Sequence, residues 1–341
     1  MKIEALMTIA AQLVADDKGL LAIDESIGTC NRRFAEHDIA QTEERRRRWR
    51  ELIITTPDIG QSISGMILSD ETIHQATAAG IPFAWALTNA GILVGIKVDA
   101  GAKPLAGFPG ESVTEGLDGL RQRLQTYAEL GASFAKWRAV FSVDQGTPST
   151  ACILANAHSL ARFAALCQEA GLVPIVEPEL LMDGDHDLDV CGGLSRAILT
   201  TVFEQLSSQR VLLEAVILKP NMVLAGTDCR EQGTSQQVAD ATMQCLLRTV
   251  PAALPGIAFL SGGQSPALAS TRLNAINVRF QSSRPWPLAF SFGRAIQQPA
   301  LSCWAGEDRN IARAQAELGY RARCNRAARR GEYDLATDAP Y

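Results

Sequence analysis

The chain has 341 residues, of which 47% are hydrophobic and 20% are charged, so it can bury a large core as one big domain or two ordinary ones. Its formal net charge of −5 gives no global field that would attract nucleic acid or an anionic membrane, which argues against both as partners. We also expect no membrane-spanning helix, because no apolar run approaches the roughly 20 residues that such a helix needs.

The cysteines and the N-terminus indicate a cytoplasmic protein. Eight cysteines are scattered along the chain without a CxxC pair, which is typical of reduced thiols that pack in a core. The stretch from Met1 to Leu6 contains an early acid and no long apolar run, so it does not resemble a secretory signal.

Predicted helices and short apolar strands alternate along the chain. A helix is expected over residues 3–17, where apolar side chains recur at helical spacing before Gly19. Eight strands are then predicted at residues 19–26, 64–70, 92–99, 134–141, 173–179, 215–219, 256–263 and 287–294. Helices between them are predicted near residues 42–54, after the strand at residues 64–70, and near residues 116–130, 149–170, 189–208, 234–249 and 266–275, with more after residue 294.

This alternation predicts a parallel sheet with helical crossovers, and eight such units in one chain predict a closed (β/α)8 TIM barrel. An open doubly wound sheet is the alternative. It would need a G-x-G-x-x-G fingerprint after its first strand, which Asp24 to Gly28 do not supply. No linker marks a second domain. Residues 1–330 are therefore predicted to form one barrel with an extra N-terminal helix and C-terminal helices, followed by a tail at residues 331–341.

Polar side chains gather where the predicted strands end. They are Asp24, Ser26, Lys97, Asp99, Lys136, Arg138, Glu177, Glu179, Lys219, Ser261 and Arg294. Several of them lie two residues apart, so both members of such a pair face one side of a strand. In a TIM barrel that side is the interior, and the carboxyl ends of the strands form the active-site mouth. Packing alone does not explain so many polar strand ends, so the pattern predicts an active site.

Lys219 ends the apolar strand at residues 215–219, and Pro220 then stops the ladder. Burial and a nearby positive charge both lower the pKa of a lysine, and such an amine can form a Schiff base with a carbonyl. Lys136 is expected to point into the same mouth, so each lysine would disfavour the charge of the other. The alternative is a lysine that merely snorkels to solvent at a strand end.

The carboxylates of the mouth are candidates for proton transfer. Glu177 and Glu179 can supply a general acid and base, and Asp24 can supply a further proton acceptor. The alternative for the two glutamates is simple ion pairing with the lysines, and we expect that pairing to be part of the site.

Two candidate phosphate sites flank these groups. The loop from Ser261 to Pro266 contains Gly262 and Gly263 and opens a helix, whose free N–H groups can bind phosphate. The loop after the eighth strand adds Ser291, Gly293 and Arg294, and barrel phosphate sites commonly use these two loops. A second anion site is predicted from Ser26, Thr29, Arg33 and Lys97.

Two other motifs are interpreted without a role in catalysis. The basic run from Glu44 to Glu51, which includes Arg45 to Arg48, is predicted to be a solvated helix face or an oligomer contact rather than a nucleic-acid site. The stretch from Asp183 to Asp187 resembles a metal site but is interpreted as an Asp/Gly loop, and no metal is predicted.

At this point the sequence resembles the class I fructose-bisphosphate aldolases over nearly its whole length. The motifs that carry the resemblance are GIKVD (95–99), LAG..GE (105–111), EGLDGL (115–120), FAKWR (134–138), VEPE (176–179), DGDHDL (183–188), LKPNMV (218–223), FLSGGQS (259–265) and SFGRA (291–295). Nine motifs in the same order as in the family make the resemblance specific. It implies an (α/β)8 barrel, commonly a homotetramer, that needs neither a metal nor another cofactor.

The resemblance also implies roles for individual residues. It identifies Lys219 as the Schiff-base lysine and Glu177 as the main proton-transfer residue, assisted by Lys136, Asp24 and Glu179. Residues that would hold the phosphate of the ketose end are Ser261, Gly262, Gly263, Ser291, Gly293 and Arg294. Residues that would hold the rest of the sugar bisphosphate are Arg33, Ser26, Thr29, Lys97 and Arg138. The C-terminal Tyr341 matches a family tyrosine implicated in proton exchange after cleavage.

The predicted activity is the reversible cleavage of fructose 1,6-bisphosphate to dihydroxyacetone phosphate and glyceraldehyde 3-phosphate, as in glycolysis and gluconeogenesis. One alternative is a Schiff-base aldolase that prefers another sugar bisphosphate, such as sedoheptulose 1,7-bisphosphate. The other is a scaffold without activity that kept the barrel and binds a partner through its Arg-rich helix.

Overall fold

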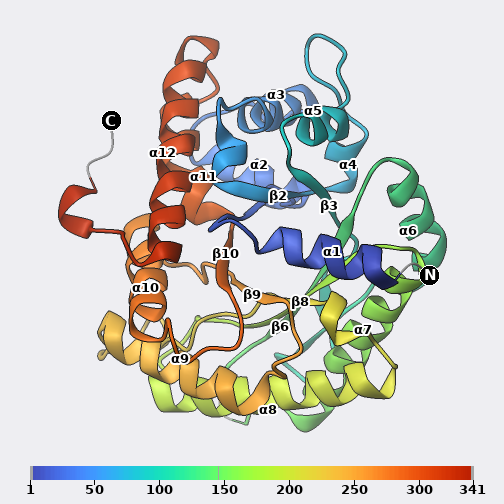
Figure 1. Cartoon of the computed structure of the whole chain (residues 1–341), viewed down its shortest axis with the longest axis vertical. Helices are drawn as coiled ribbons and strands as arrows, with labels where there is room; N and C mark the ends of the chain where they lie inside the picture. Colours follow the sequence, from blue (N-terminus) through green and yellow to red (C-terminus); the bar gives the residue numbers. More distant parts are fainter. Residues whose placement is uncertain (1–2, 145, 339–341) are drawn as a thin grey trace.

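The computed structural model describes residues 3–144 and 146–338, and its centre is a closed barrel of eight parallel strands (Figure 1). The barrel strands are β1 (Gly19–Ala22), β2 (Ile63–Leu68), β3 (Leu93–Lys97), β6 (Phe134–Phe141), β7 (Val173–Leu180), β8 (Ile217–Leu218), β9 (Gly256–Phe259) and β10 (Leu288–Phe292). They follow one another around the barrel in chain order, and β10 closes it by pairing with β1. The predicted TIM barrel is confirmed.

Helices surround the barrel in the order that crossover connections require. In chain order the described helices are α1 (Ile3–Leu13), which lies outside this ring, α2 (Ile27–Ala35), α3 (Glu43–Ile54), α4 (Asp70–Ile73), α5 (Phe83–Asn89), α6 (Leu120–Glu129), α7 (Thr150–Glu169), α8 (Leu188–Ser208), α9 (Ser235–Thr249), α10 (Pro266–Arg279), α11 (Arg294–Trp304) and α12 (Ile311–Arg330). The Gly/Pro-rich segment after β3 carries a small antiparallel hairpin of β4 (Ala102–Pro104) and β5 (Ser112–Thr114).

Helix α2 was not predicted from the sequence. It has only 9 residues, and its buried apolar side chains are Cys30 and Phe34, so its apolar face is short. Its start is nevertheless marked, because the Ser26 side chain accepts a hydrogen bond from the Thr29 N–H. The helix therefore forms on a good N-cap and on packing rather than on a strong apolar stripe.

Helix α7 corrects the expectation that no segment has the length and composition of a membrane span. Within the part of the chain that the structure describes, it is the one helix that is long and apolar enough. Half of its most apolar window is buried in the protein. It packs on β6, β7 and α8, so its apolar residues are explained by the core of the barrel.

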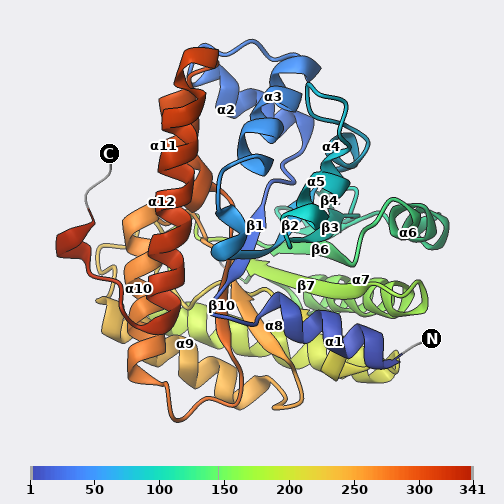
Figure 2. The same ribbon diagram turned by 45° about the horizontal axis from the view of Figure 1, so that its top comes forward.

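The inside of the barrel changes from apolar to charged along the strands. Inward positions near the amino ends belong to one apolar cluster, which includes Leu20, Phe134, Ile175 and Ile217. Helix α1 lies across this end instead of joining the outer ring of helices, and its Leu6, Ala10 and Leu13 belong to the same cluster (Figures 1 and 2). Because inward positions recur every second residue, the inward side chains of the same strands are charged at the carboxyl ends.

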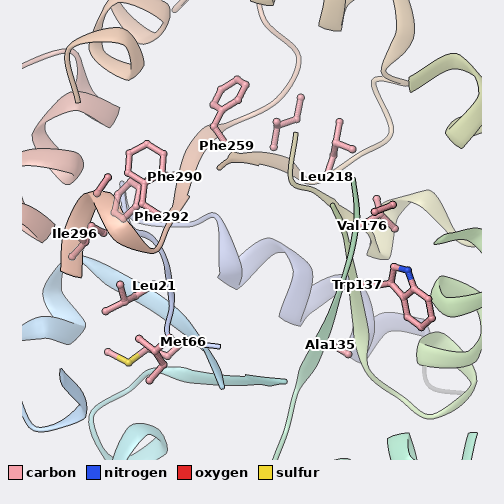
Figure 3. Packing of buried hydrophobic residues seen from close by; sticks show 14 of the residues in the cluster. Leu21, Met66, Ala135, Trp137, Val176, Leu218, Phe259, Phe290, Phe292 and Ile296 are labelled. Carbon is pink, nitrogen blue, oxygen red and sulfur yellow. The ribbon is translucent and has the colours of Figure 1, made fainter. Parts of the chain in front are cut away.

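The outward positions of the strands form the larger hydrophobic cluster under the helices. Figure 3 shows labelled members of this cluster radiating from the outer face of the barrel, among them Leu21, Trp137, Val176, Leu218 and Phe290. They alternate along the strands with the inward residues, which is why the strands read as continuous apolar runs.

The Phe134 ring lies inside the closed end of the barrel, and it leaves room only for glycine at the adjacent position of the neighbouring strand. A Cβ atom built on Gly95 of β3 would fall within the van der Waals radius of the Phe134 ring of β6. Both residues are paired in the sheet, Gly95 directly opposite Phe134. The close approach of strand and ring therefore requires glycine at this point.

We expect Gly95→Ala to lower the free energy of unfolding by about 1–3 kcal/mol, because the added methyl group overpacks the barrel interior. Urea unfolding followed by circular dichroism would measure this. Gly193→Ala is the matched control, since a Cβ there lies 3.9 Å from its nearest neighbour on α8. Alanine should stabilise that helix by about 0.5–1 kcal/mol. Equal effects of the two substitutions would contradict the packing argument.

Candidate active site

A cavity of about 430 Å³ opens at the carboxyl ends of the barrel strands. Its lining includes the predicted site residues Asp24, Ser26, Thr29, Arg33, Lys97, Lys136, Arg138, Glu177, Glu179, Lys219, Ser261, Gly262, Ser291, Gly293 and Arg294. Gly263 follows in the same loop but is not part of the lining. Tyr341 lies outside the described residues. The side chains that the sequence placed at strand ends are thus brought together from seven of the eight barrel strands, all except β2.

Four buried charged groups form the floor of this cavity. The Lys136 ammonium lies 2.6 Å from the Asp24 carboxylate and 3.1 Å from the Glu177 carboxylate. The other oxygen of Glu177 lies 3.0 Å from the Lys219 ammonium. Lys219 and Lys136 are each 4% exposed along the side chain, so Lys219 does not snorkel to solvent, and that alternative is wrong. Glu177 therefore bridges the two lysines.

Neighbouring strands place these groups in contact through their register. Arg138 of β6 lies opposite Glu177 of β7, and Val176 of β7 lies opposite Leu218 of β8. The residue after Leu218 is Lys219, whose N–H donates to the Val176 carbonyl. A shift of one residue would turn Glu177 or Lys219 to the outer face.

Burial and charge pairing oppose each other in this network. Burial alone would raise the pKa of Asp24, but Lys136 and Lys219 lower it to about 2. Burial alone would likewise raise the pKa of Glu177, and the same two lysines lower it. Burial disfavours the charge of Lys136, yet Asp24 and Glu177 raise its pKa above the ordinary value. The expectation that the two lysines depress each other's pKa therefore fails for Lys136, because it has two carboxylate partners.

The next residues toward the rim are also paired. Arg138 donates to the Glu179 carboxylate at 2.5 Å, and Lys97 donates to Asp99 at 2.6 Å. Glu179 was expected to pair with the lysines of the site, but the contact that the structure gives it is to Arg138. Asp99 also accepts from the Arg138 N–H, so it links β3 to β6 at the rim.

The loop after β9 has the features of an anion site. Gly262 and Gly263 both have positive φ angles, of 55° and 76°. Ser265 caps α10 with its side chain, and Pro266 is the first residue of that helix, as predicted. The Gly262 N–H has no hydrogen-bond acceptor among residues 3–144 and 146–338. The loop therefore presents a free donor at the cavity.

The loop after β10 adjoins it and supplies further donors. Ser291 is buried, and its hydroxyl has no hydrogen-bond partner in the described part of the chain. Gly293 precedes α11, whose first residue is Arg294, and both line the cavity. A buried hydroxyl without a partner is costly in free energy, so its position next to a cationic helix start fits an anionic ligand.

A further part of the cavity wall is built by α2 and its N-cap, with Ser26, Thr29 and Arg33. Arg33 is 6% exposed and donates to Glu25 and to Gln297. Glu25 also pairs at 2.9 Å with Arg50 of α3. Neither Glu25 nor Arg50 was predicted from the sequence, although the position of Glu25 directly beside Asp24 was a usable signal.

The Arg-rich helix is not a solvated face, which was one of its two predicted roles; the other, an oligomer contact, stays a prediction. Arg46 and Arg50 are buried, at 7% and 2% exposure, and Arg46 pairs with Glu71 at 2.6 Å. Arg45 donates to the Gly306 carbonyl at 2.7 Å. Arg47 and Arg48 pair with carboxylates of the same helix and with Asp308. The run binds the helix to the barrel, because its guanidinium groups already have acceptors within the chain.

Two remaining stretches are the loop from Asp183 to Asp187 and the C-terminal tail. The residues from Asp183 to Asp187 form a loop, as predicted, and Asp187 caps α8 by accepting from the Val190 N–H. Within the described ranges, no three His, Cys, Asp or Glu side chains come together to hold a metal ion. The last described residue of the tail, Asp338, is held by two 2.7 Å contacts to Arg321.

Comparisons with known proteins show which family the chain belongs to. The family described as "Fructose-bisphosphate aldolase class-I" matches residues 5–340. A probable fructose-bisphosphate aldolase class 1 of Xylella fastidiosa (strain 9a5c) is 53% identical over 334 residues, which cover 98% of this chain and 99% of the relative. Fructose-bisphosphate aldolase B of Gallus gallus is 48% identical over 97% of this chain and 91% of its own.

Similarity to a solved structure extends to the whole fold. The fructose-bisphosphate aldolase of Plasmodium falciparum, solved in complex with TRAP and a small-molecule inhibitor, superposes with a TM-score of 0.95. The two chains are 45% identical, and the match covers 97% of this chain and 95% of the other.

The Asp24 carboxylate predicts how stability depends on pH. Its pKa is about 2 in the folded protein and 3.8 without the fold, so its ion pair stabilises the protein above pH 4 and this contribution is lost as pH falls toward 2. The difference corresponds to about 2 kcal/mol. Urea unfolding at pH 6 should show Asp24→Asn to be destabilised by about that amount, with a smaller difference from wild type at pH 3.

The exposed Glu204 of α8 is the control for this measurement. Glu204→Gln should follow the wild-type stability at each pH. A constant gap between Asp24→Asn and wild type from pH 6 to pH 3 would show that the ion pair is not the cause.

Proposed function

We propose, since the chain belongs to the class I fructose-bisphosphate aldolase family, that it cleaves its sugar bisphosphate through a Schiff base on Lys219. The observation that carries this proposal is the Glu177 carboxylate, which lies 3.0 Å from the Lys219 ammonium and 3.1 Å from the Lys136 ammonium on the cavity floor. A nucleophile next to a general base, with a third group orienting that base, is the arrangement that covalent catalysis requires.

The two lysines have different roles in this proposal. Lys136 is held between two carboxylates and stays cationic, so it can stabilise negative charge and orient Glu177 but does not act as the nucleophile. Lys219 contacts one carboxylate, and that carboxylate can accept its proton. The amine that forms the covalent bond is therefore Lys219.

The first half of the reaction builds the iminium. The Lys219 amine attacks C2 of the open-chain ketose, and the C2 oxygen takes up a proton to give a carbinolamine. Glu177, in its protonated form, donates a proton as the C2 hydroxyl leaves as water, and a protonated Schiff base remains. The positive nitrogen is then an electron sink adjacent to the bond that will break.

The second half breaks the C3–C4 bond. Glu177 or Asp24 takes the proton of the C4 hydroxyl, the C4 carbonyl forms, and the electrons of the C3–C4 bond move to the iminium and give an enamine. Glyceraldehyde 3-phosphate leaves. A proton is then added to C3, and water hydrolyses the iminium to release dihydroxyacetone phosphate and the free Lys219 amine.

Two phosphate sites orient the substrate across this floor. We assign the phosphate of the ketose end to the loops after β9 and β10, where the Gly262 N–H, the Ser291 hydroxyl and Arg294 provide donors. The other phosphate is assigned to the part of the cavity lined by Arg33, Lys97 and Arg138. Anchoring both ends places C2 at Lys219 and reduces the entropy that the reaction must lose.

Membership of the family also suggests where the protein works and how it assembles. We propose that the protein works in the cytoplasm on the glycolytic and gluconeogenic substrate, as a homotetramer without a metal or cofactor. One similar protein, from Cicer arietinum, is named a cytoplasmic isozyme and is 47% identical over 97% of this chain. The scaffold alternative is not favoured, because the charged groups of the cavity floor are all in place.

Borohydride trapping tests the proposed nucleophile. Sodium borohydride added with fructose 1,6-bisphosphate should reduce the iminium and leave a stable adduct on the peptide that contains Lys219, as read by mass spectrometry. Lys219→Met should abolish both the adduct and cleavage. EDTA should leave the wild-type rate unchanged. An adduct on Lys136, or a rate that disappears with EDTA, would contradict the proposal.

Substrate preference separates the two aldolase alternatives. We expect kcat/KM for fructose 1,6-bisphosphate to exceed that for sedoheptulose 1,7-bisphosphate, measured in the same coupled assay. Fructose 1-phosphate, which lacks the second phosphate, should show a lower kcat/KM than either bisphosphate because it loses one anchor. A higher kcat/KM for the seven-carbon substrate would favour the alternative.

A further inference from the structure

Arg272 is a buried cation outside the cavity for which neither the sequence nor the proposed mechanism gives a reason. It lies in the second turn of α10 and is 5% exposed. Within the described ranges its Nε atom has no hydrogen-bond partner. Burial lowers the pKa of Arg272, and no carboxylate offsets this effect. Among the other buried arginines, Arg46 and Arg321 pair with a carboxylate, whereas Arg329 donates to the carbonyls of Val14, Ala15 and Lys18.

The contacts of Arg272 lead to the loop that we assign to the phosphate of the ketose end. Its Nη1 donates to the side-chain oxygen of Gln264 at 3.0 Å. The amide nitrogen of Gln264 donates in turn to the Ser261 carbonyl at 2.9 Å, and the Gln264 N–H donates to the same carbonyl at 3.0 Å. Arg272 thus fixes which way the Gln264 amide faces, because it takes the oxygen and leaves the nitrogen for the loop.

Holding the Ser261 carbonyl also orients a donor of the cavity. The Ser261 carbonyl and the Gly262 N–H belong to one planar trans peptide unit, so they point in opposite directions. With the carbonyl held by Gln264, the Gly262 N–H is directed away from Gln264. Gly262 lines the cavity, and its N–H is the one that lacks an acceptor within the described residues.

A second contact reaches the loop that follows the Lys219 strand. The Nη2 atom of Arg272 lies 3.5 Å from the Gln232 carbonyl. The side chain of Gln232 donates to the carbonyls of Gly226 and Cys229, at 2.7 Å and 2.9 Å. One guanidinium group therefore contacts the loops after β8 and β9, which lead from Lys219 and from the phosphate loop.

A role in folding alone would not call for a charge at this point. A buried cation whose acceptors are neutral carbonyl oxygens is expensive, and an apolar side chain of similar size would stabilise the helix at lower cost. Arginine, in contrast, offers several donors in a fixed planar fork that can hold two loops at once.

We propose that Arg272 is a positioning residue, which acts through Gln264 to orient the Gly262 N–H for the phosphate of the ketose end. This inference rests on the function proposed above for the loop from Ser261 to Ser265. Arg272 does not touch the substrate, so its effect is on binding of the phosphate group.

The test compares Arg272→Leu, Arg272→Lys and Gln264→Leu with wild type. We expect Arg272→Leu and Gln264→Leu each to raise KM for fructose 1,6-bisphosphate about tenfold while kcat changes less than about threefold, since a charged hydrogen bond to the loop is lost. Calorimetry with inorganic phosphate as the probe should show the same weakening. Arg272→Lys should give an intermediate KM, because one donor remains.

Two further variants make the result decisive. The double variant Arg272→Leu with Gln264→Leu should be no weaker than either single variant, because both act on one path. Thr271→Ala is the control, since among the described residues the Thr271 hydroxyl bonds only to the Ala267 carbonyl within α10, and its KM should stay at the wild-type value. If Arg272→Leu does not fold, Gln264→Leu and Arg272→Lys carry the test.

Failure of this inference can be told apart from failure of the proposed function. If borohydride labels Lys219 in wild type but KM and phosphate affinity stay within about twofold in folded variants, Arg272 has no positioning role. A full rescue by Arg272→Lys together with an unaffected Gln264→Leu would also overturn it, because charge alone would then suffice. If wild type is not labelled at Lys219, the proposed function fails first.

Discussion

One carboxylate held between two ammonium groups is the interaction on which the rest of the site depends. Glu177 lies within 3.1 Å of both Lys136 and Lys219, and all three are buried. None of these charges would be tolerated at this depth without the others, because an isolated buried ion loses its hydration without compensation. The pairing gives Lys136 two partners and Lys219 one, and that asymmetry separates a fixed cation from the amine that we propose as the nucleophile.

The barrel supplies this interaction by controlling which side chains face inward. The same inward rows that hold Phe134 and Ile175 at the closed end hold Lys136 and Glu177 at the open end. Helix α1 and the Phe134 ring fill the closed end, so the cavity opens only where the strands end. The helices that begin after β9 and β10 place hydrogen-bond donors at the rim of the cavity. The buried Arg272 contacts the loops after β8 and β9.

Much of this could be predicted from the sequence, and the reasons are local. Buried parallel strands are short apolar runs, and charged residues at their ends stand out, so all eight strands and most cavity residues were found. Helix α2 was missed because it is short and mostly polar, with only Cys30 and Phe34 as buried apolar side chains. The burial of Arg50 and Arg272 could not be seen, since it depends on partners such as Glu25 and Gln264 that come from other elements. The raised pKa of Lys136 also depends on three strands meeting, and no spacing in the chain encodes that.

The most direct measurement is a crystal structure of the protein soaked with dihydroxyacetone phosphate and reduced with borohydride. The account predicts continuous electron density from the Lys219 side-chain nitrogen to C2 of the ligand, with Lys136 still placed between Asp24 and Glu177. The phosphate should lie against the loops after β9 and β10. Density that joins C2 to Lys136, or a ligand that lies in the cavity unbound to either lysine, would contradict the account.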